Sequence, residues 1–462
     1  MTAIAPVVSE AEALRYARAN RGRAIDELRH FVRQPSVSAR QTSVARCGAW
    51  LADHLRRIGL RDSALVETGG NPVVVATWRH APGRPTLLVY GHYDVQPPEP
   101  LSAWTSPPFE AKLRGGCIYG RGASDDKGQL FSHVKAIEAW LAACARLPCN
   151  VICVFEGEEE MGSAHLPAFL RANRPRLAAD AAVVSDMSMR APDHPALTYS
   201  LRGVVTFELE FRAAPADVHS GVFGGAVANA ANELCRVVAS LQDRHGRIAL
   251  DGFYDDVKAH GPRECALMAA NGPADAELLS AAGVRRGTGE PGYSAYERTT
   301  IRPSLSVNGI SAGYEGKGGK AVIPARATAK LSIRLVPRQR PERVERLVRE
   351  HLARVASPGV EVDVKFGARA LPVELPRAHP GAAAAARACR RIWGRDPALL
   401  RSGGSIEVID DLQQILALPV VALGFGLRDD RWHAPNERFP VRRFGLATDT
   451  SIAFLSEFGA RT

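Results

Sequence analysis

Histidine and carboxylate side chains follow several short apolar runs of this sequence. His92 and Asp94 lie in GHYDVQP directly after TLLVYG, and Asp186 ends AAVVSD. His433 lies in WHAPNE, a few residues after PVVALGF. Imidazole and carboxylate groups bind borderline divalent cations such as zinc. A carboxylate near a histidine can also hold the ring of a metal ligand. These four residues are therefore candidate members of a metal site, although a turn histidine is the better explanation of His92 when the residue is taken alone.

An acidic cluster follows another apolar run, in VICVFEGEEEMGS. It contains Glu156, Glu158, Glu159 and Glu160. Carboxylates that are crowded into a partly desolvated crevice repel one another, and their pKa values rise unless a cation offsets their charge. The start of a helix near Met161 could accommodate one or two of them, but the whole cluster indicates a bound cation.

Asp125 and Asp126, in GRGASDDKGQ, precede a helix that is expected to begin at Lys127. They could serve only as acidic residues at a helix N-terminus, where the helix dipole favours negative charge. A charge count favours a metal-binding role, because two divalent ions would be neutralised by Asp125, Glu160, Asp186 and one further glutamate. We therefore expect two ions, about 3.5–4 Å apart, with a bridging carboxylate. Zinc suits the donors better than magnesium or calcium.

The elements that must position these residues alternate between strands and helices. Such alternation predicts an α/β fold with a doubly wound, mostly parallel sheet, in which ligands bind beyond the carboxyl ends of the strands. The expected strands are 86–91, 151–156, 181–186 and 419–425, and the expected helices are 10–33, 43–58, 127–146 and 380–393.

The middle of the chain has a different pattern, which is typical of half-buried antiparallel strands with interspersed helices. We therefore expect an α/β domain formed by residues 1–198 and 377–462, interrupted by an inserted α+β domain at 199–376. The expected strands of the insertion are 199–212, 303–310, 325–336 and 360–366, and its expected helices are 226–242 and 341–356. The glycine-rich stretch at 313–320 lacks the spacing of a phosphate loop and is expected to form a hairpin or flexible loop.

The amino-acid composition argues against several classes of function. The chain has 462 residues and a net charge of +10, but its basic residues form no dense run with interleaved aromatic residues, which argues against nucleic-acid binding. No apolar stretch has the roughly 20 residues that cross a membrane, and no secretory signal is readable. The eight cysteines form no C-x-x-C pair. We expect reduced, mostly buried thiols and a cytoplasmic protein without a membrane or nucleic-acid partner.

Eight motifs, taken in order, resemble one enzyme family. GHYDVQP, YGRGASDDKG, EGEEEMGS, VVSD, DVHSGVFGG, LSIRLVP, GGSIEVI and HAPNE are similar to the two-zinc metallopeptidases that include carnosinases, bacterial dipeptidases and glutamate carboxypeptidases. Succinyl-diaminopimelate desuccinylase and acetylornithine deacetylase are relatives. The resemblance covers about residues 25–456 and is nearest to the carnosinase-like dipeptidase branch.

The resemblance implies two divalent ions per subunit, zinc in the first place, with manganese or cobalt as alternatives. It implies that His92 and Asp186 bind one ion, that Glu160 and His433 bind the other, and that Asp125 bridges them.

It also implies that Asp94 orients His92 and that Glu159 is the general base, which takes a proton from a water activated by the ions. The other register of the acidic motif, with Glu158 as base and Glu159 as ligand, stays open.

For the inserted domain, the resemblance implies a lid and a dimer interface. His219 would reach the active site of a partner subunit and stabilise the oxyanion. Arg334 would bind the terminal carboxylate of the substrate. Asn308 and the turn with Gly404 and Ser405 are weaker candidates for substrate contacts.

Together, these features predict a homodimeric metal-dependent hydrolase that cleaves the amide bond next to a free carboxylate in dipeptides or short peptides. An N-acyl or N-carbamoyl amino acid hydrolase with the same mechanism is an alternative, because only the acyl pocket would differ. A third hypothesis is that the chain is a non-catalytic homologue that binds metal.

Overall fold

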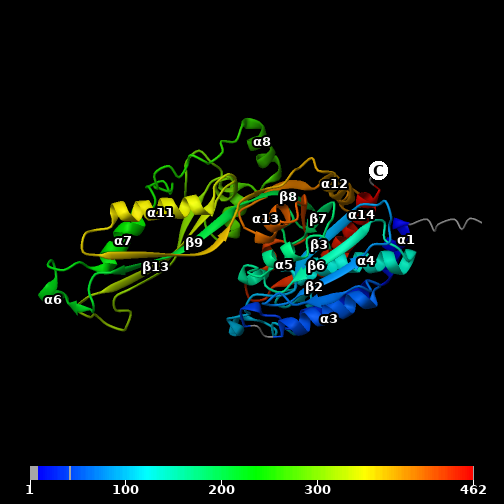
Figure 1. Ribbon diagram of the computed structural model, residues 1–462, viewed down its shortest axis with the longest axis horizontal. Coiled ribbons are helices and arrows are strands. Elements are labelled where there is room, and N and C mark those ends of the chain that lie inside the picture. Colours follow the sequence, from blue (N-terminus) through cyan, green and yellow to red (C-terminus); the bar gives the residue numbers. More distant parts are fainter. Residues whose placement is uncertain (1–8, 41–42, 461–462) are drawn as a thin grey trace, which may run out of the picture. The chain divides into compact units, whose positions relative to one another are not determined.

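The computed structural model describes residues 9–40 and 43–460, which divide into two compact units (Figure 1). Unit 1 takes the described residues of Met1–Tyr199, Leu375–Leu400 and Glu407–Thr462. Unit 2 takes Ser200–Glu374 and Arg401–Ile406. Each unit has its own hydrophobic core.

Unit 1 is built on a mixed sheet whose central strands β6, β3, β7 and β17 are parallel, which confirms the α/β fold class. The flanking strands β1, β2 and β8 are antiparallel to their neighbours. Across the sheet, these strands lie in the order β1-β2-β6-β3-β7-β17-β8. Their bounds are β1 Ala64–Val66, β2 Val73–Trp78, β3 Thr86–His92, β6 Asn150–Glu156, β7 Ala181–Val184, β8 Ala196–Leu201 and β17 Val420–Gly424. Two further strands, β15 Val373–Glu374 and β16 Ala398–Ser402, pair with β8. A small separate sheet contains β4 Lys112–Arg114, β5 Cys117–Tyr119 and β18 Arg438–Pro440.

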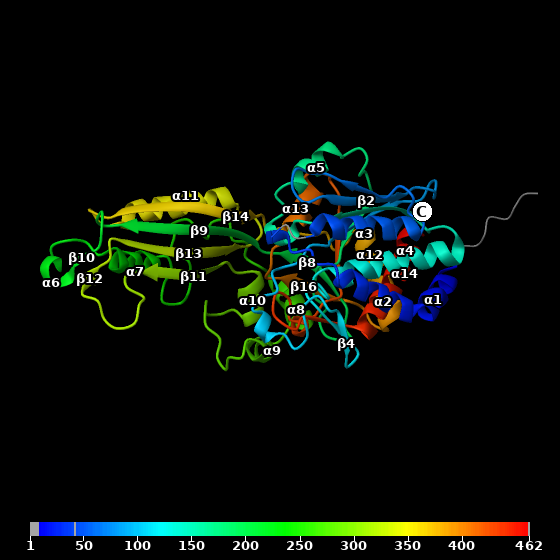
Figure 2. The same ribbon diagram turned by 90° about the horizontal axis from the view of Figure 1, so that it is seen from below.

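Helices cover both faces of this sheet (Figure 2). One face carries α4, α12 and α14, of which α14 packs against both of the others, while α5 and α13 lie on the opposite face. The helices of unit 1 are α1 Glu10–Ala19, α2 Arg21–Val32, α3 Val44–Arg57, α4 Lys127–Cys144, α5 Leu166–Ala172, α12 Pro380–Trp393, α13 Glu407–Gln414 and α14 Val441–Gly459. Its short 3-10 helices are η1 Ser38–Arg40, η2 Leu101–Ala103, η3 Glu159–Met161 and η4 Arg428–Asp430.

The central strands of unit 1 consist mainly of apolar, often β-branched residues, because helices cover both of their faces. In β6 every residue after Asn150 is buried. The helix α4 is buried around most of its circumference, since it packs against β3 and also against α1, α2 and α14. The expected helix at 10–33 is two helices, because the backbone of Asn20 leaves the helical region between α1 and α2.

Unit 2 contains a four-stranded antiparallel sheet of order β11-β13-β9-β14. Helices α7 and α11 pack along one of its faces (Figure 1). Residues alternate in β9, where Val205, Phe207, Leu209 and Phe211 are buried, as expected for a sheet that is covered on one side. Its strands are β9 Gly203–Arg212, β11 Ser304–Ala312, β13 Arg326–Leu335, β14 Glu361–Ala370 and the two-stranded pair β10 Val218–His219 and β12 Val322–Ile323. Its helices are α6 Ser220–Phe223, α7 Ala230–Ser240, α8 Pro262–Asn271, α9 Asp275–Ala281, α10 Ala295–Thr300 and α11 Pro341–Val355.

One expected strand of the insertion is divided. The run at 199–212 forms β8 and β9, with Arg202 between them. The glycine-rich stretch at 313–320 forms no helix or strand, as expected. No helix among the described residues is both long and apolar enough to cross a membrane.

Candidate metal centre

His92 is the last residue of β3 and is fully buried. Its Nδ1–H donates to the backbone carbonyl oxygen of Asp94 at 3.1 Å and lies 3.4 Å from Asp94 Oδ1. This contact fixes the orientation of the ring and directs Nε2 into the site. Nε2 points toward Asp125 Oδ1, at 3.2 Å, and toward Glu159 Oε2, at 3.9 Å.

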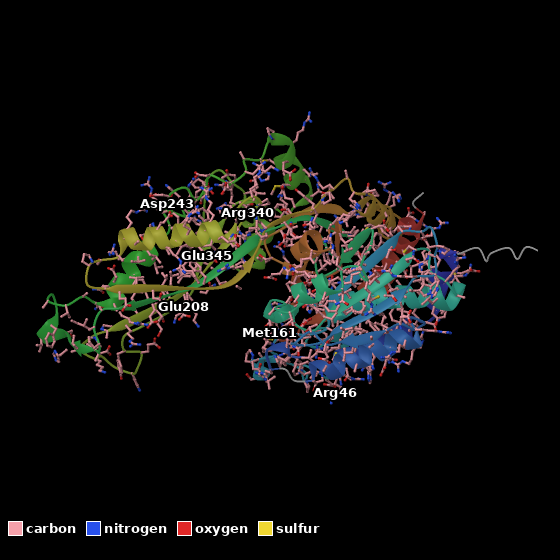
Figure 3. The ribbon with its side chains drawn as sticks, viewed as in Figure 1. Arg46, Met161, Glu208, Asp243, Arg340 and Glu345 are labelled. Atoms are coloured by element: carbon pink, nitrogen blue, oxygen red, sulfur yellow. The ribbon has the colours of Figure 1, made fainter. Side chains whose placement is uncertain are left out.

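Glu159 and Glu160 lie in the short helix η3, which follows β6. Their backbone N–H groups donate to the two carboxylate oxygens of Asp94, at 3.2 Å and 3.1 Å. Asp94 therefore holds both the ring of His92 and the turn that carries the two glutamates. The turn ends at Met161, which is labelled in Figure 3 and whose side chain is 53% exposed.

Asp125 lies between the two histidines. Its Oδ1 is 3.2 Å from His92 Nε2, and its Oδ2 is 2.9 Å from His433 Nε2. His433 Nε2 also lies 3.3 Å from Glu160 Oε2. His433 has a φ of +56°, a backbone region that residues other than glycine rarely adopt and that is often found at functional sites. A single carboxylate thus contacts two imidazoles that are separated by most of the chain.

Asp186, two residues beyond β7, completes the group. Possible ligand atoms of His92, Glu159 and Asp186 lie within 4.8 Å of one another, and so do those of His92, Asp125 and Glu160. The strands β6, β3, β7 and β17 are adjacent and parallel, so that their carboxyl ends meet at one edge of the sheet. This topology explains how residues from distant segments converge.

Negative charge is in excess in this group. Burial and then the nearby charge of Asp125 raise the pKa of Asp186 to about 7. Burial likewise raises the pKa of Glu159 well above its usual value, to which the charges of Asp186 and Glu160 contribute. Hydrogen bonds to Asp125 and then to Glu160 raise the pKa of His433 to about 10. Burial also acts to raise the pKa of Asp125, but the hydrogen bonds from His433 and His92 lower it below its usual value.

This donor set fits divalent cations. Two imidazoles and several carboxylates are crowded together here, and all of them except the exposed His433 are buried or half-buried. They offer ligands that zinc and similar ions prefer, and a cation would offset the repulsion that raises the carboxylate pKa values. The side chains of the site therefore match the chemistry of a metal centre.

The remaining residues of the acidic motif face elsewhere. Glu158 Oε2 lies 2.9 Å from His165 Nδ1, and Glu158 Oε1 accepts from the backbone N–H of Asn71 at 2.8 Å. Glu156 is buried and accepts from the hydroxyl groups of Tyr90, at 2.5 Å, and Ser163, at 3.0 Å.

Glu437 is a supporting residue that we did not identify from the sequence. Its buried carboxylate accepts from the backbone N–H groups of Gly122, Ser124 and Asp125 at 2.9, 2.9 and 3.0 Å, and from Arg121 Nη1 at 2.7 Å. Gly122 has a φ of +82°, which suits glycine. Glu437 therefore fixes the loop that presents Asp125. The only feature of the sequence that pointed to Glu437 was its position in the HAPNE motif, four residues after His433.

A third group of possible ligands, Glu27, His54 and Glu138, differs from the first two. The ammonium group of Lys135 forms ion pairs with both Glu27 and Glu138. A lysine thus already supplies the positive charge at this place, and the group is explained without a metal.

The other expected site residues belong to unit 2. Arg334, in β13, donates from Nη1 to the hydroxyl oxygen of Ser405 at 3.0 Å. His219 ends β10, is exposed, and caps α6 by accepting from the N–H of Gly221 at 2.9 Å. Asn308 is exposed at an irregularity of β11, and Gly404 is exposed next to Ser405. Within the described parts of unit 2, neither His219 nor Asn308 hydrogen-bonds to Arg334.

Similarity to known proteins confirms the resemblance. The model of peptidase family M20/M25/M40 matches residues 88–457. The Cys-Gly metallodipeptidase DUG1 of Saccharomyces cerevisiae is 31% identical over 438 residues, covering 88% of this chain and 89% of that protein. The human Beta-Ala-His dipeptidase is 31% identical over 445 residues, covering 92% of this chain and 86% of that protein. Among solved structures, a metallo-carboxypeptidase from Sulfolobus solfataricus is similar with a TM-score of 0.86 and 30% identity, covering 94% of this chain and 99% of that one. The family model spans most of the chain and two of its relatives are metallodipeptidases or dipeptidases, so this chain belongs to peptidase family M20/M25/M40 and is a metallopeptidase.

Proposed function

We propose that this chain is a dipeptidase with two divalent ions, zinc in the first place, which hydrolyses the peptide bond next to a free carboxylate. The observation that carries the proposal is the carboxylate of Asp125, whose two oxygens each approach a different imidazole, at 3.2 Å and 2.9 Å. A carboxylate whose two oxygens face different sets of ligands can bridge the two ions of a two-metal hydrolytic site, about 3.5–4 Å apart. Dipeptides are preferred over N-acyl amino acids because the relatives described above act on dipeptides.

Five residues would hold the two ions: His92 and Asp186 one, Glu160 and His433 the other, with Asp125 between them. The ions would polarise the scissile carbonyl and lower the pKa of the attacking water.

Glu159 is the proposed general base. Glu159 Oε2 lies 3.9 Å from His92 Nε2 and thus faces the candidate metal centre. The carboxylate of Glu158, in contrast, contacts His165 outside this centre. Burial raises the pKa of Glu159, and two bound ions would oppose that rise. Glu159 takes a proton from the attacking water and delivers it to the nitrogen of the leaving amine, while Asp94 keeps the turn of Glu159 in place.

Unit 2 is proposed to bind the rest of the substrate and to form a homodimer. Arg334 offers a guanidinium fork for a terminal carboxylate, and Gly404 and Ser405 lie beside it. His219 is proposed to act as an oxyanion donor, and Asn308 as a further substrate contact.

An apolar surface supports the dimer. Val222, Phe223 and Val227, near α6, are 69%, 42% and 38% exposed. Ile310, on β11, is 55% exposed, and β11 is an edge strand with unpaired backbone groups on one side. Light scattering of the purified protein tests this, and a monomer at micromolar concentration would contradict it.

A substrate panel with controlled metal tests the proposed activity. The metal-free protein is reloaded with zinc, manganese or cobalt and assayed on Cys-Gly, β-Ala-His, and matched N-acetyl amino acids. We expect metal-dependent hydrolysis of at least one dipeptide, with a higher kcat/KM than for the N-acetyl compounds. A preference for N-acyl amino acids would identify a deacylase instead. Stoichiometric metal without hydrolysis of any compound would contradict an enzymatic role.

A further inference from the structure

Arg202 is a buried arginine with uncharged partners. It lies between β8 and β9 and is 8% exposed. Its Nε donates to the carbonyl oxygen of Gly403 at 3.1 Å, and its Nη1 donates to Ser304 Oγ at 3.1 Å and to the carbonyl oxygen of Arg302 at 3.4 Å. The part of the chain that the structure describes places no carboxylate within ion-pair distance of this guanidinium.

The other buried arginines of the described chain differ in this respect, because each one has an acidic partner. The pairs are Arg121 with Glu437 at 2.7 Å, Arg302 with Glu290 at 2.7 Å, Arg401 with Glu264 at 2.8 Å, and Arg443 with Asp430. Burial of an uncompensated charge is costly, and folded proteins normally pair such a group. The positive charge of Arg202 is therefore an exception, and a bound anion would offset it.

The guanidinium of Arg202 lies close to Arg334. Ser304, which accepts a hydrogen bond from Arg202, pairs directly with Arg334 across β11 and β13. Side chains of directly opposite residues lie on the same face of a sheet, with Cβ atoms about 4.5–5.5 Å apart. The hydroxyl group of Ser405 accepts from Arg334 and donates to the carbonyl oxygen of Arg202 at 2.6 Å. Burial and then the charge of Arg334 lower the pKa of Arg202 to about 10, as expected for adjacent like charges.

The segment that contains Gly403 and Ser405 packs tightly against Arg202. A Cβ atom at Gly403 would lie 2.5 Å from the carbonyl oxygen of Thr299 and 3.2 Å from Arg202 Nη2. Because only glycine allows this approach, the position of the segment and the position of the Arg202 guanidinium are coupled.

We propose that Arg202 is a positioning residue of a carboxylate subsite: it holds residues 403–405 beside Arg334 and adds a second positive charge there, and so makes the enzyme select peptides that end in a free carboxylate. The inference rests on the proposed function, and it adds a specificity determinant to it. An incoming carboxylate offsets the positive charge of Arg202, whereas a neutral amide does not, so this charge favours peptides with a free carboxylate over their amides.

The test compares the best dipeptide of the panel with its C-terminal amide. The two compounds share the scissile bond and differ in one charge. Wild type, Arg202→Met and Arg202→Lys are assayed as metal-loaded proteins, and thermal unfolding reports whether each variant is folded. Arg302→Met is the matched control, because Arg302 is 9% exposed and lies in the same region but has Glu290 as its partner.

For Arg202→Met we expect kcat/KM for the free acid to fall roughly 10- to 100-fold, mainly through KM, since a charged hydrogen-bonding group is lost. The kcat/KM for the amide should change less than threefold. The ratio of kcat/KM for the free acid to kcat/KM for the amide should therefore fall. Arg202→Lys keeps the charge without the fork and should retain part of the ratio. If Arg202→Met does not fold, the ratio for Arg202→Lys decides in the same way. Arg302→Met should keep the wild-type ratio.

Two results would overturn the inference while leaving the proposed function intact: an unchanged ratio in a folded Arg202 variant, or an equal loss of the ratio in Arg302→Met. Wild-type protein that hydrolyses no dipeptide would instead refute the proposed function, and the inference with it.

Discussion

Replacement of Glu437 by glutamine should weaken metal binding from a position that touches no metal. The carboxylate of Glu437 accepts four hydrogen bonds, of which Ser124 and Asp125 donate to one oxygen and Arg121 and Gly122 to the other. A glutamine keeps one acceptor oxygen and turns an NH2 group toward the other pair of donors. If each lost charge-assisted bond is worth about 1.5–3 kcal/mol, the free energy of unfolding falls by about 3–6 kcal/mol.

The same change loosens the loop that presents Asp125. Loss of a group that orients metal ligands typically lowers metal affinity by about 10- to 100-fold. Affinity is measured by competition with a chelator at pH 8, where Glu437 is ionised, since burial raises its pKa to about 7 against the effect of Arg121. Denaturant unfolding measures the loss of stability.

Glu290→Gln is the matched control for this variant. Glu290 is 7% exposed and accepts from Arg302 at 2.7 and 2.8 Å and from Arg247 at 2.7 Å, but it lies in unit 2. The Glu290→Gln variant should have a lower free energy of unfolding than wild type and the same metal affinity. The reasoning is refuted if Glu437→Gln binds metal within twofold of wild type, or if Glu290→Gln weakens binding equally.

Three further variants test individual roles. Glu159→Gln should keep its metal content and lose roughly 10²–10⁴ in kcat, and near-normal turnover would exclude it as the base. His219→Ala should keep its metal and lose roughly 10²–10³ in kcat, because an oxyanion donor is removed; wild-type kinetics would exclude that role. Glu156→Gln should remove a pH dependence of stability: burial raises the pKa of Glu156 from 4.5 to about 8, so the stability from its retained proton is complete below pH 4.5 and is lost as the pH rises through 8. The difference in unfolding free energy between wild type and Glu156→Gln should therefore fall by about 1.4 kcal/mol per pH unit between pH 5.5 and 7.5, and a constant difference would contradict the assignment.

The fold was largely predictable because its signals are local. The expected strand at 151–156 is β6, Asn150–Glu156, and the expected helix at 127–146 is α4, Lys127–Cys144. Apolar runs of strand length and a long apolar helix depend little on distant partners. The break at Asn20 depends on how α1 and α2 pack, which periodicity does not report.

The candidate site was predictable to the extent that motifs carry it. His92, Asp125 and His433 were proposed from separate motifs, and the structure brings them into contact. Glu437 and Arg202 were missed because most of their partners are backbone groups: Glu437 accepts from the N–H groups of a distant loop, and Arg202 donates to carbonyl oxygens. Such partners have no residue-type signature, so spacing in the sequence does not point to them.

The contact of His433 with Asp125 also has a consequence for protein synthesis. Asp125 and Glu160 leave the ribosome hundreds of residues before His433, and residues 200–374 are translated between them. A nascent chain that ends before residue 433 therefore lacks one of the two imidazoles of the candidate metal centre. If the proposed ligands are correct, we expect a chain to hydrolyse peptides only after nearly all of it has been translated.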